Sequence, residues 1–200
     1  MTNTAVQKPP ENGPEAALER AIVRALGKRS VVLVGMMGAG KSSIGRRLAA
    51  RLGVAFVDAD TEIETAAGMT IPEIFAKHGE PSFRAGEARV IARLLDGGPS
   101  VLATGGGAVM DAATRALITA KGVSIWLNAD LDVLVKRTKR RNDRPLVEKI
   151  QELMPLREPF YAMSNIEIRS RDEPHDTIVD EIIASLTRHL DVTVDEEKPS

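Results

Sequence analysis

The chain has 200 residues, of which 43% are hydrophobic and 28% are charged, and these values fit one α/β domain with a buried core. Its formal net charge of −1 gives no overall attraction to nucleic acid or to an anionic membrane, and an aromatic content of 3% argues against a base-stacking surface. The absence of cysteine excludes disulfides, cysteine-bound metals and thiol catalysis. No apolar run approaches the roughly 18 residues of a membrane span. We therefore expect a cytoplasmic protein that binds neither membranes nor nucleic acid.

The first 28 residues form an expected extension ahead of the main domain. Residues 1–14 are polar and rich in proline and glycine, which predicts disorder. Residues 15–28 then place four apolar side chains on one helical face: Leu18, Ile22, Ala25 and Leu26. This pattern favours a helix docked on the main domain over the alternative, an arm that binds a partner. We expect the main domain to span residues 29–190 and residues 191–200 to fray.

Short apolar runs alternate with helical patterns through the main domain. Strands are predicted at 30–34, 54–58, 100–104, 123–128 and 165–170. Helices are predicted at 41–53, 70–79, 81–96, 111–120, 130–141, 149–163 and 176–190, with a loop over 141–147. Thr70 and Glu73 have the spacing of a capping box, whereas Pro155 and Pro159 are expected to interrupt or end a helix. Five strands separated by helices predict a parallel sheet covered on both faces, which binds ligands beyond the carboxyl ends of its strands.

The run from Gly35 to Ser42 matches G-x-x-x-x-G-K-[ST] and lies between a predicted strand and a predicted helix. Glycines let successive backbone N–H groups turn toward an anion, and the helix N-terminus adds about half a positive charge. Lys41 can reach the β- and γ-phosphates of a nucleotide, and the Ser42 hydroxyl can bind Mg²⁺. A glycine-rich turn that only caps a helix is the alternative. The pattern predicts Mg·ATP or another nucleoside triphosphate, and the lack of an N-K-x-D segment disfavours a GTPase.

Two carboxylates, Asp58 and Asp60, end the second predicted strand, where both would face the same way. Asp58 could hold the shell of Mg²⁺ through water, and Asp60 could act as the base for an acceptor hydroxyl. The alternative for Asp60 is a cap on the following helix. Because a nucleotide loop lies nearby, we favour the functional interpretation.

Arginines in otherwise apolar contexts indicate a site for a carboxylate. Arg84 and Arg157 could grip one in bidentate geometry, although Arg84 and Glu87 also have the spacing of an ordinary surface ion pair. The triple glycine at 105–107 allows a ligand to approach closely or, alternatively, forms a hinge. Arg144 lies in a basic run and could swing over phosphates, although a solvated helix face is the usual explanation of such a run.

In combination these motifs resemble those of the shikimate kinases over roughly residues 29–190. The segments that carry the resemblance are GMMGAGKSS, FVDAD, GMTIPEIFAKHGEPSFRAGE, TGGGAV, DRPL and LREPFY. The nucleotide loop occurs in many families, whereas its ordered combination with the other segments is much more specific. One minor departure is a loop that ends in Lys-Ser-Ser where Lys-Ser-Thr is common. The resemblance implies a P-loop NTPase fold of the nucleoside-monophosphate-kinase type, with a five-stranded parallel sheet and a lid around residues 137–147.

The resemblance also implies roles on the acceptor side. Four residues would bind shikimate: Asp60, Arg84, Gly106 and Arg157. Asp60 would engage the reacting hydroxyl region, the two arginines would face the carboxylate, and Glu87 would orient Arg84.

On the nucleotide side, six consecutive residues would hold ATP: Gly38, Ala39, Gly40, Lys41, Ser42 and Ser43. Ser42 would bind Mg²⁺ directly, and Asp58 would bind it through water. Arg144 would act from the lid, Arg137 would lie against the adenine, and the backbone near Pro174 would contact that base. The residues with catalytic roles would be Lys41, Asp60 and Arg144.

The implied reaction is transfer of the γ-phosphoryl group of ATP to the 3-hydroxyl of shikimate, on the route through chorismate to the aromatic amino acids. The family resemblance also suggests a monomer. Two alternatives stay open: another small-molecule kinase such as gluconate kinase, and a non-catalytic regulator that binds ATP. The arginine pair with the triple glycine favours shikimate, and the complete acceptor side argues against a degenerate regulator.

Overall fold

The computed structural model describes residues 13–139 and 144–193. Its centre is a five-stranded parallel sheet in the order β2-β3-β1-β4-β5, as expected from the alternation of strands and helices. The strands are β1 (Ser30–Val34), β2 (Ala55–Asp58), β3 (Ser100–Ala103), β4 (Gly122–Asn128) and β5 (Ile166–Arg169). Each begins and ends within one residue of its predicted bounds.

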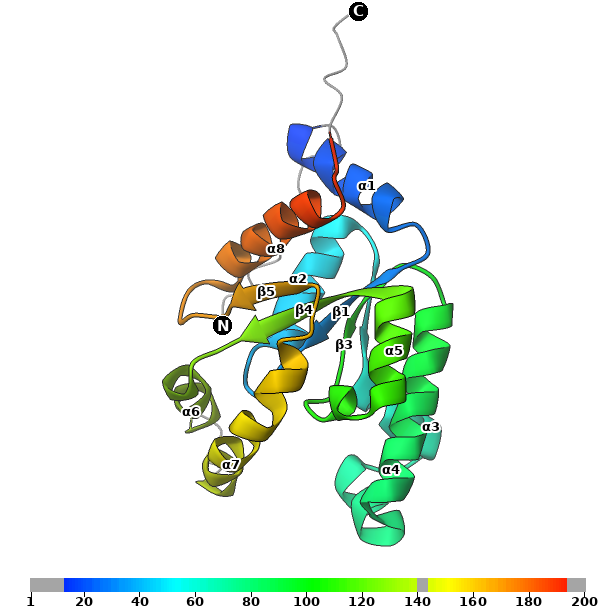
Figure 1. Ribbon diagram of the computed structural model, residues 1–200, viewed down its shortest axis with the longest axis vertical. Coiled ribbons are helices and arrows are strands. Elements are labelled where there is room, and N and C mark those ends of the chain that lie inside the picture. The colour runs from blue at the N-terminus through cyan, green and yellow to red at the C-terminus, as the bar shows by residue number, and fades with distance from the viewer. Residues whose placement is uncertain (1–12, 140–143, 194–200) are drawn as a thin grey trace, which may run out of the picture.

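Helices surround this sheet (Figure 1). They are α1 (Pro14–Leu26), α2 (Lys41–Leu52), α3 (Ala59–Ala67), α4 (Ile71–Asp96), the 3₁₀ turn η1 (Ala108–Met110), α5 (Ala112–Lys121), α6 (Leu131–Lys139), α7 (Arg144–Tyr161) and α8 (His175–His189). Helices α2 and α8 pack together with α1 on them, and α4 packs against α5 in front of the sheet. The α3–α4 and α6–α7 pairs extend as two arms at the lower right and lower left of Figure 1.

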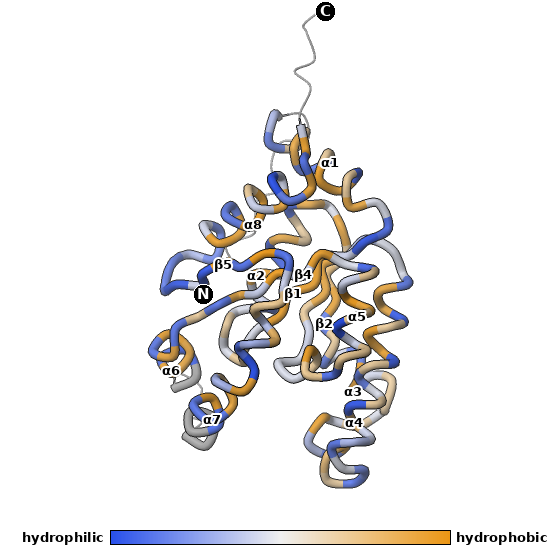
Figure 2. Tube along the Cα trace, viewed as in Figure 1, coloured by the Kyte–Doolittle hydropathy of each residue, from blue (hydrophilic) through white to orange (hydrophobic). Residues whose placement is uncertain are grey.

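The core lies between the sheet and these helices, and the tube in Figure 2 is most hydrophobic there. All of β1 is buried, because a central parallel strand is covered on both faces. The exposed ends of the helices are more polar, as Figure 2 shows. Among the described residues, no helix is both long and apolar enough to cross a membrane.

Two helices, α3 and α7, depart from the sequence prediction. Helix α3 covers Ala59–Ala67, where the predicted elements include no helix. The two helices predicted over 70–79 and 81–96 are confirmed as the two parts of α4, which are separated by a kink at Gly79, where the φ of 75° is non-helical. Helix α7 begins at Arg144, inside the predicted loop, and continues through Pro155 and Pro159, so the prediction that these prolines interrupt or end the helix was wrong. The fully buried Ile150 and the nearly buried Tyr161 anchor α7 on both sides of the prolines, and this packing outweighs their low helix propensity.

Helix α1 is fastened to the domain by apolar and ionic contacts. Ile22 and Leu26 enter the main core as expected, whereas Ala25 is exposed. Arg51 of α2 donates to the buried carboxylate of Glu19 over 2.6 Å and to the exposed carboxylate of Asp180 of α8 over 2.9 Å. The two ion pairs tie α1, α2 and α8 together.

We expect Arg51→Met to lower the free energy of unfolding by about 3 kcal/mol, because it leaves the Glu19 carboxylate buried without a partner. Asp180→Asn is the matched control, since it removes only the exposed half of the network and should cost less than about 1 kcal/mol. Urea denaturation measures both. An equal and small loss in the two variants would contradict the importance of the buried pair.

Candidate functional site

The nucleotide loop connects β1 to α2 and adopts the backbone that its glycines predict. Gly38 and Gly40 have φ values of 82° and 98°, in the left-handed region that side chains rarely occupy. No side chain caps the N-terminus of α2, so its first backbone N–H groups donate no hydrogen bond to a capping side chain. These groups and the helix dipole make the loop suited to a phosphate.

Lys41 is held by its own loop. Its Nζ donates hydrogen bonds of 2.8 and 2.9 Å to the carbonyl oxygens of Gly35 and Met36. Although Lys41 keeps some exposed surface, protein atoms surround its ammonium group. This burial lowers the pKa of Lys41 to about 8, although the negative charges of Asp60 and Asp58 act to raise it. The positive charge of this lysine is therefore sensitive to mildly alkaline pH.

A pH dependence follows from Lys41. Since kcat/KM reports the ionisation of the free enzyme, we expect kcat/KM for ATP to fall as pH rises through about 8, where the ammonium loses its proton. Bound phosphates favour the charged form, so kcat should fall only at higher pH. Initial rates at varied ATP between pH 6.5 and about 9.5 test this. A kcat/KM that stays flat across this range would contradict it.

Ser42 and Asp58, the two expected partners of Mg²⁺, lie in direct contact. The Ser42 hydroxyl donates to Asp58 Oδ2 over 2.7 Å, and the backbone N–H of Asp60 donates to Asp58 Oδ1 over 3.1 Å. Asp58 is thus the N-cap of α3, and the alternative that Asp60 caps this helix was wrong. The expectation that both carboxylates lie on one strand was also wrong, because β2 ends at Asp58 and Asp60 is already helical.

The Ser42–Asp58 contact fits an oxygen-bound cation. Mg²⁺ favours oxygen ligands, keeps several waters and commonly takes few protein ligands beside the phosphates of a nucleotide. Within the described ranges no group of three acidic, histidine or cysteine side chains is arranged to hold a metal by itself. The residues present therefore fit a cation that shares its ligands with a phosphate.

Asp60 faces the triple glycine across the end of the sheet. A Cβ at Gly105 would lie only 2.8 Å from Asp60 Oδ1 and 2.9 Å from Glu87 Oε1, so glycine is needed for this approach. Burial raises the pKa of Asp60, the negative charge of Asp58 raises it further, and the positive charge of Lys41 opposes both. A carboxylate with a raised pKa is better able to accept a proton.

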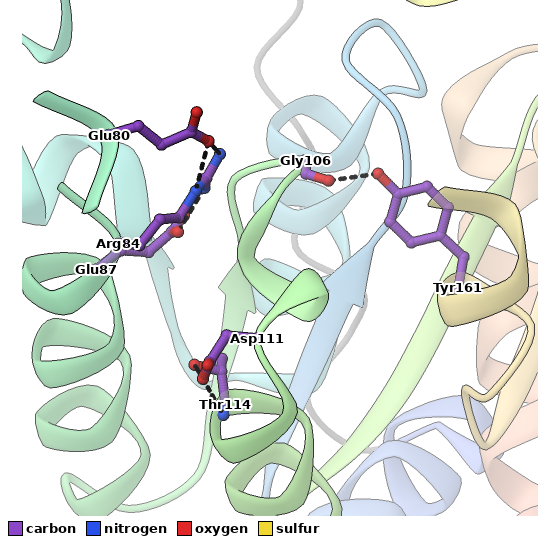
Figure 3. A network of polar contacts seen from close by, with 7 residues as sticks. All are labelled: Glu80, Arg84, Glu87, Gly106, Asp111, Thr114 and Tyr161. Carbon is purple, nitrogen blue, oxygen red and sulfur yellow. Dashed lines mark hydrogen bonds and ion pairs between the residues drawn. The ribbon is translucent and has the colours of Figure 1, made fainter. Parts of the chain in front are cut away.

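Arg84 reaches the same loop from α4. It donates to Glu87 Oε2 over 2.6 Å and to Glu80 over 3.2 Å (Figure 3). Its guanidinium lies so close to Gly107 that a Cβ added to this glycine would be only 2.5 Å from the nearest guanidinium nitrogen. The Glu87 side chain is only 3% exposed, so the interpretation of an ordinary surface ion pair was wrong. The buried Glu87 Oε1 has no partner within the described part of the chain.

Arg157 and Tyr161 reach the loop from α7, and Tyr161 lies on the other side of the loop from Arg84 (Figure 3). A Cβ at Gly106 would lie 3.2 Å from Arg157 Nη1, and the buried Tyr161 hydroxyl donates to the Gly106 carbonyl. Burial raises the pKa of Tyr161 to about 12, so the hydroxyl stays a donor. Tyr161 was not among the predicted site residues, although its i, i+4 spacing from Arg157 places both on one face of a helix.

Arg137 lies at the nucleotide loop, on the side of β5. Its guanidinium donates to the carbonyl oxygens of Gly38 and Ala39 over 3.3 Å and to that of Arg171 over 2.7 Å, and to the Ser170 hydroxyl over 3.0 Å. Ser170 itself bonds the Ala39 carbonyl over 2.9 Å, a contact that spacing did not predict. Arg144 begins α7, but its side chain is not among those described, and residues 140–143 of the expected lid fall outside the described residues.

Comparison with known proteins places this arrangement in one family. The shikimate kinase family model matches residues 37–187. The chain belongs to the shikimate kinase family. Curated shikimate kinases from Bradyrhizobium diazoefficiens and Rhodopseudomonas palustris are 63% and 58% identical to it, over 88% and 90% of this chain and 88% and 94% of their own lengths.

Solved structures agree with this membership. A shikimate kinase from Acinetobacter baumannii in complex with shikimate is 34% identical, with a TM-score of 0.77 over 88% of this chain and 98% of that one. A gluconokinase from Sinorhizobium meliloti has a TM-score of 0.60 over 82% of this chain and 94% of that one, at 21% identity, which shows a common fold alone. As a shikimate kinase family member, the chain is an ATP-dependent phosphotransferase.

Proposed function

We propose that the chain transfers the γ-phosphoryl group of ATP to the 3-hydroxyl of shikimate, with Mg²⁺ bound to the nucleotide. The observation that carries this proposal is the position of Asp60. Asp60 faces Gly105 of the triple glycine, and the charges of Lys41, in the nucleotide loop, and of Arg84 both act on its pKa. An acceptor hydroxyl at Asp60 would therefore lie beside the transferring phosphate.

The acceptor side fits a ring that carries both hydroxyls and a carboxylate. Arg84 of α4 and Arg157 of α7 both approach the triple glycine, and their guanidinium groups can bind a carboxylate between them. Glu87 holds Arg84 in place, and the Tyr161 hydrogen bond holds Gly106. Gly106 then offers backbone contacts to the ring, and Asp60 is left for the hydroxyl.

The nucleotide side fits the triphosphate of ATP. The backbone of residues 38–43 would wrap the phosphates, Lys41 would exchange its loop carbonyls for the β- and γ-phosphates, and Arg137 would lie beside the adenine. Ser42 would hold Mg²⁺ directly and Asp58 would hold it through water, so the ion would neutralise phosphate charge. Arg144 would act from the lid.

Catalysis would rest on positioning and on charge. Phosphoryl transfer passes through a loose transition state whose charge is spread over the phosphate oxygens, and fixed cations stabilise it. Lys41 provides such a cation from a rigid loop, while Asp60 orients the hydroxyl and accepts its proton. Closure of the lid would exclude water and so prevent futile hydrolysis of ATP. We also propose a monomeric, cytoplasmic enzyme of aromatic amino-acid biosynthesis.

The direct test is ADP release with Mg·ATP and one acceptor in each reaction: shikimate, gluconate, a nucleoside monophosphate or none. We expect release with shikimate only, and the product should be 3-phosphoshikimate by NMR. Release with gluconate instead would move the proposal to the sugar-acid kinase that shares this fold. ATP binding without release in any reaction would favour a non-catalytic regulator.

Arg157→Ala should raise KM for shikimate about tenfold to a hundredfold, because charge-assisted bonds to its carboxylate are lost. KM for ATP should change little. Arg188→Ala, which removes an exposed arginine that donates a hydrogen bond to Ser185 of its own helix, is the control. An unchanged KM for shikimate in Arg157→Ala would remove this residue from the acceptor site.

A further inference from the structure

A cavity of about 430 Å³ lies between α3 and α4, in the arm at the lower right of Figure 1. Its apolar wall includes Ile63, Met69, Ile74, Phe83 and Val90. These residues belong to a small hydrophobic cluster that is separate from the main core. None of the four proposed shikimate-binding residues lines this cavity. Its volume falls within the range of small-molecule sites, which is about 300–1,000 Å³.

Basic side chains are among the residues that line this cavity. Arg89, Arg93 and His78 line it together with the apolar residues. Arg93 forms an ion pair of 2.9 Å with the exposed Glu62, whereas Arg89 has no hydrogen-bond or ion-pair partner in the described part of the chain. No acidic side chain is among the lining residues. The cavity therefore combines an apolar interior with an uncompensated guanidinium.

We propose that this cavity binds a small amphipathic carboxylate, a molecule with an apolar ring and one carboxylate, and that its occupation changes the affinity of the shikimate site. The ring would contact the side chains of Ile63, Ile74 and Phe83, and the carboxylate would meet Arg89. A planar guanidinium suits this pairing because it can bind both carboxylate oxygens at once.

The two sites share their walls. On α4, Phe83 and Gly86 line the cavity, while the next residues, Arg84 and Glu87, face the triple glycine. On α3, Ile63 lines the cavity one turn after Asp60. A ligand that moves α3 relative to α4 would therefore move the groups that we assign to shikimate binding. The difference between the ligand's affinities for the two arrangements of these helices, before and after this movement, sets the size of the coupling. This coupling rests on the proposed function, whereas binding in the cavity does not.

A larger side chain at Gly86 can fill the cavity without removing any existing side-chain contact. It is a lining residue, and a Cβ added to it would meet no heavy atom within 4 Å. Gly86→Leu should therefore fill the cavity while it improves the helix propensity of α4. Ala85→Leu is the matched control, because Ala85 is the exposed neighbouring residue and does not line the cavity.

The test measures binding of 3-phenylpropionate by isothermal titration with the shikimate site saturated, and repeats it with the uncharged analogue 3-phenylpropan-1-ol. We expect saturable binding of the acid with a Kd on the order of 1 mM or tighter. Arg89→Gln should weaken the acid about tenfold and leave the alcohol unchanged, since only the acid forms a charge-assisted pair. Gly86→Leu should abolish binding, and Ala85→Leu should preserve it.

The same titration in Arg157→Ala separates the two sites. The acid should bind this variant as it binds the wild type, and in the wild type it should shift the Kd for shikimate at least twofold. Absence of binding, or binding that survives Gly86→Leu, would overturn the cavity assignment, and an unchanged Kd for shikimate would overturn the coupling. Wild-type ADP release with shikimate and no added acid tests the proposed function by itself, so its failure is distinguishable.

Discussion

Replacing Lys41 by methionine is expected to lower kcat by roughly 10²- to 10³-fold, the loss typical of removing one preorganised group that stabilises transition-state charge. Methionine keeps an unbranched apolar stem of similar length, so packing around the loop should survive. Within the described ranges of the chain, the Lys41 ammonium bonds only to the carbonyl oxygens of its own loop, Gly35 and Met36, and those carbonyls can be rehydrated in the variant. Steady-state kinetics with shikimate and ATP measure the change.

Stability provides the check on Lys41→Met. Because the folded state lowers the pKa of Lys41 from 10.5 to about 8, it binds fewer protons than the unfolded state between these values. Wild-type stability should therefore rise with pH across that window, and the variant should lack this contribution. Lys121→Met, which removes an exposed ion pair with Asp96, is the control for losing a lysine elsewhere. Full activity in Lys41→Met would refute the nucleotide-loop assignment.

The sheet was predictable because each parallel strand is covered on both faces and so appears as a short apolar run. SVVLV and VSIWLN are examples, and both are almost wholly buried. The helices were less predictable where tertiary packing decides. Pro155 and Pro159 have poor intrinsic propensity, yet α7 continues because it is anchored by buried residues that no local pattern identifies.

The site was predictable in its residue types and less so in its contacts. Gly40, Lys41 and Ser42 follow from a motif whose spacing is dictated by phosphate geometry. By contrast, the i, i+3 spacing of Arg84 and Glu87 is the same for a surface pair and for a buried one, and only the fold shows that Glu87 lies against the triple glycine. Ser170 is more than 100 residues from Ala39 in sequence, so its bond to that loop required the fold as well.

Asp60→Asn is expected to lower kcat by roughly 10²- to 10⁴-fold, the range associated with loss of a general base. Asparagine can still accept a hydrogen bond from the acceptor hydroxyl, but it cannot take the proton. KM for shikimate should therefore change less than kcat. Asp96→Asn, on the exposed ion pair with Lys121, is the control. A loss confined to KM would make Asp60 a binding residue without a catalytic role.

The raised pKa of Asp60 gives this variant a second, opposite signature. Its folded-state pKa lies above the unfolded value, so the folded state binds more protons through that window and loses stability as pH rises through it. At neutral pH the ionised Asp60 therefore weakens the fold, and Asp60→Asn should raise the melting temperature while it removes activity. Wild-type kcat should also fall at acid pH as Asp60 is protonated, and the variant should lack this limb. A variant that is both inactive and less stable would instead indicate that Asp60 maintains the structure of the loop.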